Sequence, residues 1–296
     1  MKKTLQSAQI SAALLLGSVR LSVAILGPLS EDTNLRQNER TPVPNNIITI
    51  KKYQGTQEAR LHTFLQRFVQ SIANRSGQYR RQWFRDQGYP DYGLLTNERG
   101  SYSLMAAAMD RITPIHQSEM SVSKRVDYRK PANRDRPRHR AGRVDLWSYS
   151  DGFEYFMEFK RGYLSPAHMH GCTVPKTIRD PWKDLVNQIV EVKQGIAHDP
   201  DYEEYWAHTY FIGMHTVTIR RRSKNRKTIR SAHVNQFTQV ELRNWSRKLS
   251  PIPDAVFAWK IAPEKHRICP IDWSDDKEIK WVSFPCHLFC FTIKCN

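Results

Sequence analysis

Residues 142–160, GRVDLWSYSDGFEYFMEFK, decide the fold of this chain. Asp151 and Gly152 are a two-residue turn signal flanked by β-branched and aromatic residues, which predicts a β-hairpin closed by a type I′ turn. If these two residues form the loop, residues at equal distance from the turn face each other across the strands. Asp145 then faces Glu158, so the hairpin is expected to set two carboxylates side by side.

The two faces of the predicted hairpin differ in character. The apolar face, expected to be buried against helices, carries Val144, Leu146, Tyr155, Met157 and Phe159. The other face carries the two carboxylates, and Lys160 lies two residues beyond Glu158 on the same side. A slip of one residue would turn a carboxylate into the apolar layer at a cost on the order of several kcal/mol, so the pattern specifies one register.

The opposed carboxylates need a physical explanation, because like charges at this cross-strand spacing repel each other. A divalent cation would relieve that repulsion. The alternative is an ordinary solvent-facing pair on an amphipathic hairpin, with Lys160 and Arg143 offsetting the charge. Trp147 and Phe156 share the face with the carboxylates, which is unlike a simple solvated surface. We therefore interpret the pair as a candidate metal site.

Asp145 followed by Glu158, Phe159 and Lys160 resembles the D…(D/E)-x-K motif of the PD-(D/E)XK nuclease superfamily. The proline that precedes the Asp in the family is replaced here by Val144. The resemblance implies an α/β fold with a restriction-endonuclease-like core, in which a central mixed sheet carries a catalytic β-hairpin flanked by helices. It also implies Mg²⁺- or Mn²⁺-dependent hydrolysis of DNA phosphodiester bonds.

The same resemblance assigns roles to the motif residues. Asp145, Glu158 and the backbone carbonyl of Phe159 would bind the metal. Lys160 would position or help deprotonate the attacking water and would stabilise charge in the transition state. The alternative function is a non-catalytic nucleic-acid-binding protein that keeps the fold and the charge. Retention of all three core side chains weighs against that alternative.

Residues 97–112 are expected to form the helix before the hairpin, because their spacing places one stripe of side chains on one face. The stripe consists of Glu98, Tyr102, Met105, Met109 and Ile112. The family usually contributes a further acidic residue from this helix, so Glu98 is the candidate auxiliary ligand. The alternative is that Thr96 caps the helix and Glu98 complements its macrodipole. Glu119, in the alternating segment 116–128, is the fallback ligand or a polar residue on an edge strand.

A second helix is expected to begin at Asp180-Pro181, where proline would occupy the first turn. Its apolar positions follow helical spacing and are Trp182, Leu185, Ile189 and Val192. Gln188 lies among them and is expected to reach the site as an auxiliary residue. Val192 stands where the RecB-like branch of the superfamily has tyrosine, so that branch is not supported. Residues 209–219 are expected to form a central strand beside the hairpin.

Charge points to an anionic partner. The chain has 46 Lys and Arg against 29 Asp and Glu, a net charge of +17, and a pI of about 9.8, as expected of a nucleic-acid binder. Two basic blocks, 124–143 and 220–230, flank the site elements. The predicted nucleic-acid contacts are Arg134, Arg136, Arg138, Arg140, Arg143, Arg220, Arg221, Arg222 and Lys224. DNA is the expected partner, while RNA, a homodimer and solvated basic loops stay open as alternatives.

The chain divides on composition into three parts. Residues 1–46 are expected to be an N-terminal extension and linker, 47–230 the nuclease core, and 231–296 a C-terminal α+β elaboration. The elaboration has a helix expected at 234–249 and strands at 255–261 and 280–294, which either complete the sheet or form a DNA-contacting module. Residues 1–30 resemble a secretory signal, but Arg20 interrupts the apolar run, which is too short to span a bilayer. No membrane association is therefore expected.

Cysteine usage bears on compartment and on zinc. Five cysteines, clustered late, do not form a disulfide framework, so a reduced, cytoplasmic protein is expected, with secretion as the alternative. Two groups of possible zinc ligands are His168, His170 and Cys172, and Cys286, His287, Cys290 and Cys295. Neither group has the paired spacing of a zinc site. In a terminal strand, Cys286 and Cys290 are instead expected to share a buried face.

Overall fold

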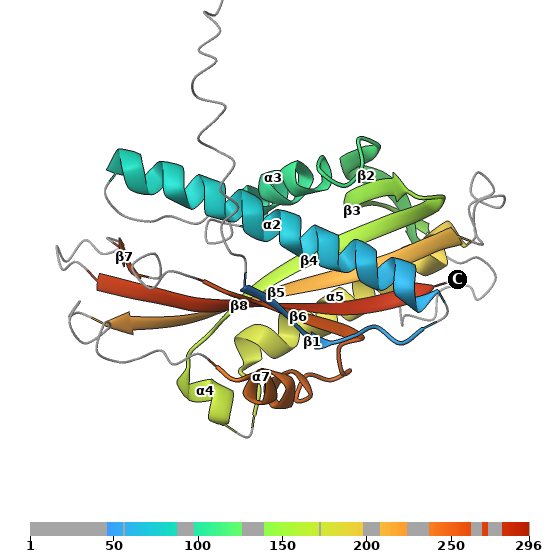
Figure 1. The fold of residues 1–296 in the computed structure, drawn as a ribbon. Helices are drawn as coiled ribbons and strands as arrows, with labels where there is room; N and C mark the ends of the chain where they lie inside the picture. The colour runs from blue at the N-terminus through green and yellow to red at the C-terminus, as the bar shows by residue number, and fades with distance from the viewer. Residues whose placement is uncertain are drawn as a thin grey trace, which may run out of the picture. The chain divides into compact units, whose positions relative to one another are not determined.

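The computed structural model describes residues 46–55, 57–87, 98–125, 139–171, 173–197, 208–223, 237–261, 268–271 and 280–295. They form a mixed α/β arrangement built on an eight-stranded sheet (Figure 1). The strands are β1 (Asn46–Lys51), β2 (His116–Arg125), β3 (His139–Ser150), β4 (Phe153–Leu164), β5 (Thr209–Ser223), β6 (Ala255–Lys260), β7 (Ile268–Ile271) and β8 (Lys280–Cys295). The helices are α2 (Glu58–Gln87), α3 (Glu98–Met109), α4 (Ala167–His170), α5 (Lys176–Ile196) and α7 (Gln239–Ser246).

The strand order is β1-β6-β8-β5-β4-β3-β2, and β7 pairs with β8 outside this path. The pairing of β4 with β5 is parallel and the other pairings are antiparallel, so the sheet is mixed. β6 and β8 lie between β1 and β5, so the C-terminal part of the chain completes the sheet. The helix expected at 234–249 is shorter than predicted, because a capping box at Thr238 and Glu241 starts α7 at Gln239.

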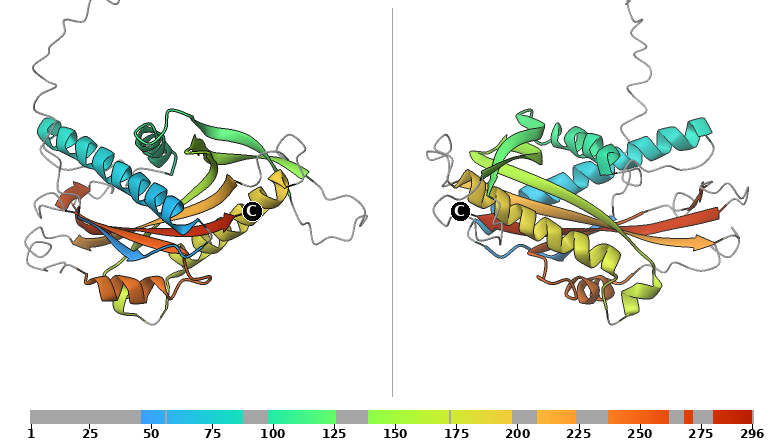
Figure 2. Two further views of the ribbon diagram at one scale, coloured as in Figure 1. Left: turned by 45° about the vertical axis from the view of Figure 1, so that its right-hand side comes forward. Right: turned by 180° about the vertical axis from the view of Figure 1, so that it is seen from behind.

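Helices cover both faces of the sheet (Figures 1 and 2). On one face α2 and α3 pack over β3, β4 and β5, and Phe68 and Met105 meet Met157 in one apolar cluster. On the other face α5 packs against β4 and β5, while α7 contacts β1. Trp182 and Trp245 belong to the cluster on this second face. A sheet covered on both sides explains why β5 is buried along most of its length.

The β3–β4 hairpin has the predicted turn and register. Asp151 and Gly152 have φ values of 56° and 83°, as a type I′ turn requires. The ladder runs from the pair Ser150 and Phe153 to the pair Leu146 and Met157. The type I′ turn and the predicted register between the turn and the Leu146–Met157 pair are therefore confirmed, while the predicted pair of Asp145 and Glu158 lies beyond the end of the ladder.

The predicted apolar face is wrong at Val144. Leu146 packs in the cluster beneath α2 and α3, whereas Val144 packs on the opposite face with Ile189 of α5. Residues two apart in a regular strand share a face, so β3 changes direction at the residue between them, Asp145. In β2 the residue opposite this bend, Glu119, has a φ of 53°. Beyond the bend, β2 and β3 continue as a two-stranded arm, and β2 contacts α5.

Helix α5 lies close to the strand that it covers. It begins at Lys176 rather than at Asp180, so the predicted start is wrong; Pro175 precedes the helix and Pro181 lies inside it. A Cβ added at Gly213 of β5 would lie 2.8 Å from Leu185 of α5. The glycine therefore permits the close helix–strand approach. Within the described residues, no helix is long and apolar enough to cross a membrane.

Candidate active site

Asp145 lies where β3 leaves β4. The ladder between the two strands ends at Leu146 and Met157, although β4 continues to Leu164 beside β5. The Asp145 carboxylate accepts a hydrogen bond from the backbone N–H of Phe159, with 2.7 Å between N and Oδ2. A side-chain carboxylate thus replaces the backbone acceptor that a continuing ladder would have supplied. This contact fixes the carboxylate at the opening between the strands.

Glu158 joins Asp145 as the hairpin pattern predicted. Glu158 is only 3 % exposed, and its side chain lies within hydrogen-bonding reach of that of Asp145. The side chain of Tyr102 in α3 also lies within hydrogen-bonding reach of Asp145. The site therefore joins β3, β4 and α3.

Burial raises the pKa of Asp145 above its usual value. Four neighbouring groups lower the pKa of Asp145 without cancelling the effect of burial. They are the N–H of Phe159, the positive charge of Lys160 and the side chains of Tyr102 and Glu158. The largest cause of the raised Asp145 pKa is therefore burial, and not repulsion from Glu158.

Lys160 lies next to a buried histidine that sequence reasoning missed. It pairs in register with His215 of β5, whose side chain is fully buried and stacks on Trp182 at 6.3 Å between ring centroids. The pKa of His215 is lowered to about 3, mainly by burial and also by the charge of Lys160, although the backbone of Arg161 opposes the shift. His215 is therefore neutral at physiological pH and leaves Lys160 as the cation of this pair.

The auxiliary residues predicted from the sequence have different outcomes. Glu98 is the first residue of α3, but its side chain lies outside the described part of the chain. Gln188 lies on α5, and its buried Oε1 has no hydrogen-bond partner among the described residues. Glu119 forms an exposed ion pair with Arg143, with 3.3 Å between Oε2 and Nη1, on the edge strand β2. This position agrees with the alternative interpretation of Glu119 as an edge-strand polar residue.

The first basic block is mostly outside the described residues. This applies to all atoms of Arg134, Arg136 and Arg138 and to the side chain of Arg140. Arg143 is exposed in the arm formed by β2 and β3.

The second basic block begins at the end of β5, and Lys224 follows it outside the described residues. Arg220 is partly buried, with its Cζ 3.7 Å from the centroid of the Tyr163 ring. Arg221 is partly buried and Arg222 is exposed. The described part of this block therefore brings three guanidinium groups to the end of one strand.

The candidate zinc groups do not assemble in the described part of the chain, where no three His, Cys, Asp or Glu side chains come together. Cys286 and Cys290 are buried in one apolar cluster, as expected of thiols on a shared strand face. The Sγ of Cys295 lies 3.1 Å from the Tyr53 hydroxyl. His168 and His170 are exposed on α4, and Cys172 lies outside the described residues.

The Asp145 and Glu158 pair suits a hard divalent cation. Mg²⁺ is commonly bound through one or two carboxylates and keeps several waters, so two carboxyl groups are a sufficient protein contribution. A cation bound between the two carboxyl groups would neutralise both of them. The backbone of Phe159 contacts the site through its N–H, while the role predicted for its carbonyl stays a prediction. The donor set therefore fits Mg²⁺ or Mn²⁺.

Comparison with protein-family models, with curated proteins and with solved structures gives no match for this chain.

Proposed function

We propose that this protein is a metal-dependent nuclease of the PD-(D/E)XK type, with a restriction-endonuclease-like core, that hydrolyses DNA phosphodiester bonds. One observation carries the proposal: two neighbouring carboxyl groups, Glu158 buried and Asp145 partly buried, lie beside Lys160 where two strands separate. Burying two carboxylates without a compensating positive charge for each is costly, and a divalent cation offsets that cost. The two carboxyls and Lys160 also follow the order of the D…(D/E)-x-K motif.

Each residue has a role that follows from its contacts. Asp145 and Glu158 would hold the cation, and Tyr102 and the Phe159 N–H orient the Asp145 carboxylate. Bound Mg²⁺ or Mn²⁺ supplies neutralisation of the scissile phosphate and activation of a water. Lys160 orients that water and stabilises negative charge as it develops. Neutral His215 keeps the surroundings of Lys160 free of a competing charge.

The charge of the chain supports a nucleic-acid substrate. The net charge is +17, and Arg220, Arg221 and Arg222 end the strand that pairs with β4. Such groups bind backbone phosphates without regard to base sequence, and they position the strand rather than perform chemistry. DNA is the proposed substrate, and RNA belongs among the substrates to be tested.

The experiment is a cleavage assay on four substrates: supercoiled, linear and single-stranded DNA, and RNA, each with Mg²⁺, with Mn²⁺ and with EDTA. Cleavage of at least one DNA form only with metal supports the proposal. Binding of DNA without cleavage under every condition would instead favour the non-catalytic nucleic-acid-binding protein. Products from supercoiled DNA also separate an endonuclease from an exonuclease, because an exonuclease needs an end.

A further inference from the structure

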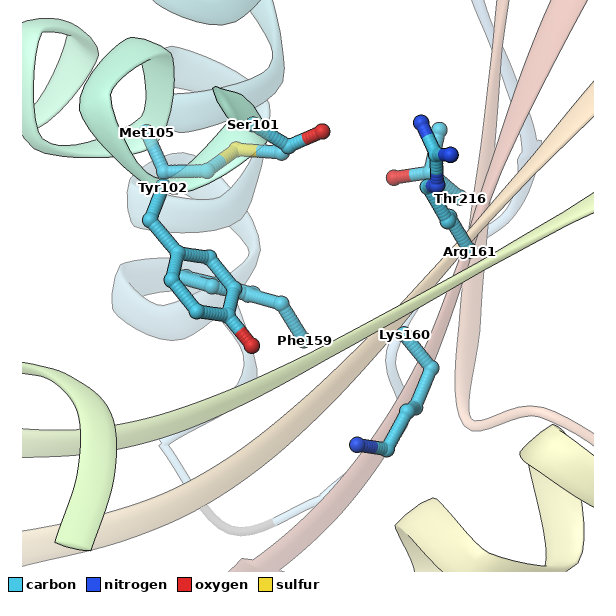
Figure 3. A pocket seen from close by; sticks show the side chains of 7 residues that line it. All are labelled: Ser101, Tyr102, Met105, Phe159, Lys160, Arg161 and Thr216. Atoms are coloured by element: carbon cyan, nitrogen blue, oxygen red, sulfur yellow. The ribbon is translucent and has the colours of Figure 1, made fainter. Parts of the chain in front are cut away.

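A second polar recess lies on the side of β4 that faces α3. Its polar groups come from Ser101 of α3, Arg161 of β4 and Thr216 of β5, and Met105 and Phe159 close its apolar side. Figure 3 shows the Ser101 and Thr216 hydroxyl groups pointing toward each other, with the Arg161 guanidinium beside Thr216. Lys160 leaves β4 on the opposite side from Arg161 in the same view. Tyr102 and Lys160, which also act on Asp145, complete the lining, so the recess adjoins the carboxylate site.

Two polar groups in this recess lack hydrogen bonds. Thr216 is 3 % exposed, and neither its Oγ1 nor the buried Nη1 of Arg161 has a partner among the described residues. A buried donor left unsatisfied costs about 1–3 kcal/mol, so such groups usually meet a ligand or water. The enclosed space is about 10 Å³, which admits one oxygen-sized group and excludes a base or a sugar ring.

The recess is also strongly positive. Arg161 and Arg220 both lie against the ring of Tyr163, with Cζ-to-centroid distances of 5.4 Å and 3.7 Å. Burial lowers the pKa of Arg220, and the charges of Arg222 and Arg161 lower it further. In the described part of the chain, no carboxylate lies within ion-pair distance of these three arginines. A group of like charges without an acid is stabilised by a bound anion.

We infer that this recess accepts an oxygen atom of a phosphate group on the substrate strand, with Arg161 and Thr216 as the donors. The inference rests on the proposed function, because the nucleic acid bound for cleavage presents the phosphate. Arg161 lies three residues along β4 from Glu158, about 10 Å at strand spacing. The side chain of Arg161 leaves β4 on the face opposite that of Glu158 and Lys160, so the phosphate in the recess is a different one from the scissile phosphate. Its source is either a backbone phosphodiester or a terminal phosphate.

The test is DNA binding in EDTA, measured by fluorescence anisotropy over a salt series. Arg161→Gln should weaken binding about 10-fold or more and lower the slope of log affinity against log salt by about 0.9 on duplex DNA. Thr216→Val should weaken binding about 3-fold to 10-fold without changing the slope, because it removes a hydrogen bond and no charge. Thr216→Ser keeps the hydroxyl and should bind as wild type does.

Arg247→Gln is the matched control, because it removes the same charge from an exposed residue at the end of α7, over the other face of the sheet. If Arg161→Gln and Thr216→Val both bind as Arg247→Gln does, the recess does not hold phosphate and the inference is overturned. Metal-dependent cleavage by wild type in that case would leave the proposed function standing. The converse result is weaker DNA binding by the variants together with no cleavage by wild type. It would overturn the proposed nuclease activity and leave the phosphate-binding recess standing.

The source of the phosphate is read from three DNA forms. These are a covalently closed circle, a linear duplex with terminal phosphates, and the same duplex with terminal hydroxyls. Equal losses of affinity on all three identify a backbone phosphodiester. A loss confined to the phosphorylated duplex identifies a terminal phosphate. Both results support the inference. It fails if the Arg161 and Thr216 variants bind all three DNA forms as tightly as the Arg247→Gln control does.

Discussion

Asp145 is predicted to have two opposite effects on the free energy of unfolding. Its oxygen atoms stabilise the fold by accepting hydrogen bonds where β3 and β4 separate, and the burial of its charge destabilises the fold. Asp145→Ala removes the acceptor of the Phe159 N–H and of the Tyr102 hydroxyl. The N–H is buried and the hydroxyl only partly so, which gives an expected loss of about 2–4 kcal/mol in the free energy of unfolding. Asp145→Asn keeps an acceptor oxygen and removes the charge whose burial is unfavourable, so its stability without metal should equal or exceed that of wild type.

The pH dependence of this effect has a defined sign. The pKa of Asp145 is raised above 3.8 in the folded protein, so the folded state holds the proton more tightly than the unfolded state does. Wild-type stability must then fall as pH rises from about 3.8 through the raised pKa, and it stays level above that. Asp145→Asn lacks this dependence. Its advantage over wild type should therefore grow with pH in this window and remain constant above it.

The assay is thermal and urea denaturation in EDTA at several pH values, with the exposed Asp184→Ala and Asp184→Asn as controls. For a domain of this size, Asp145→Ala should melt roughly 5–15 °C below Asp145→Asn. The two Asp184 variants should melt together. Equal melting of Asp145→Ala and Asp145→Asn would refute the bridging role of this carboxylate.

Three further outcomes are expected. Gly213→Ala should lower the free energy of unfolding by about 1–3 kcal/mol in urea titrations, because its Cβ would lie 2.7–2.8 Å from neighbouring side chains. The control Gly77→Ala should be neutral or stabilising, because a Cβ there meets nothing within 4 Å. Equal effects of the two substitutions would contradict the close approach of α5 to β5. Calorimetry of Mg²⁺ binding in two buffers should show proton release near the raised pKa in wild type, and persistence of that release in Asp145→Asn would place the proton elsewhere. Replacing Arg220 and Arg222 by Gln should lower the salt slope of duplex binding by about 1.8, and an unchanged slope would mean that these residues do not contact phosphates.

The local features of the fold could be predicted because they depend on neighbouring residues. Asp151 and Gly152 tolerate positive φ, so they specify the turn, and the turn sets the register that brings Asp145 to Glu158. Similarly, the apolar spacing of 182–192 predicted the face of α5 that packs on the sheet. These signals are short in range and need no knowledge of the rest of the chain.

The remaining features depend on tertiary packing. Val144 left its expected face because the arm of β2 and β3 packs against α5, and an alternating pattern does not reveal such a bend. Tyr102 was expected only as part of an apolar stripe, and its contact with Asp145 depends on where α3 docks. His215 lies in an apolar strand without a local motif, so only the parallel pairing of β4 and β5 places it beside Lys160.

The most direct test of the account is metal-dependent cleavage by Glu158→Gln compared with Glu154→Gln. The two glutamates lie on the same strand four residues apart, and burial raises the pKa of Glu154, but Glu158 is the one that acts on Asp145. With Mg²⁺, wild type and Glu154→Gln should cleave DNA at similar rates, while Glu158→Gln should bind DNA and leave it intact. Cleavage by Glu158→Gln at the wild-type rate would contradict the assignment of the active site.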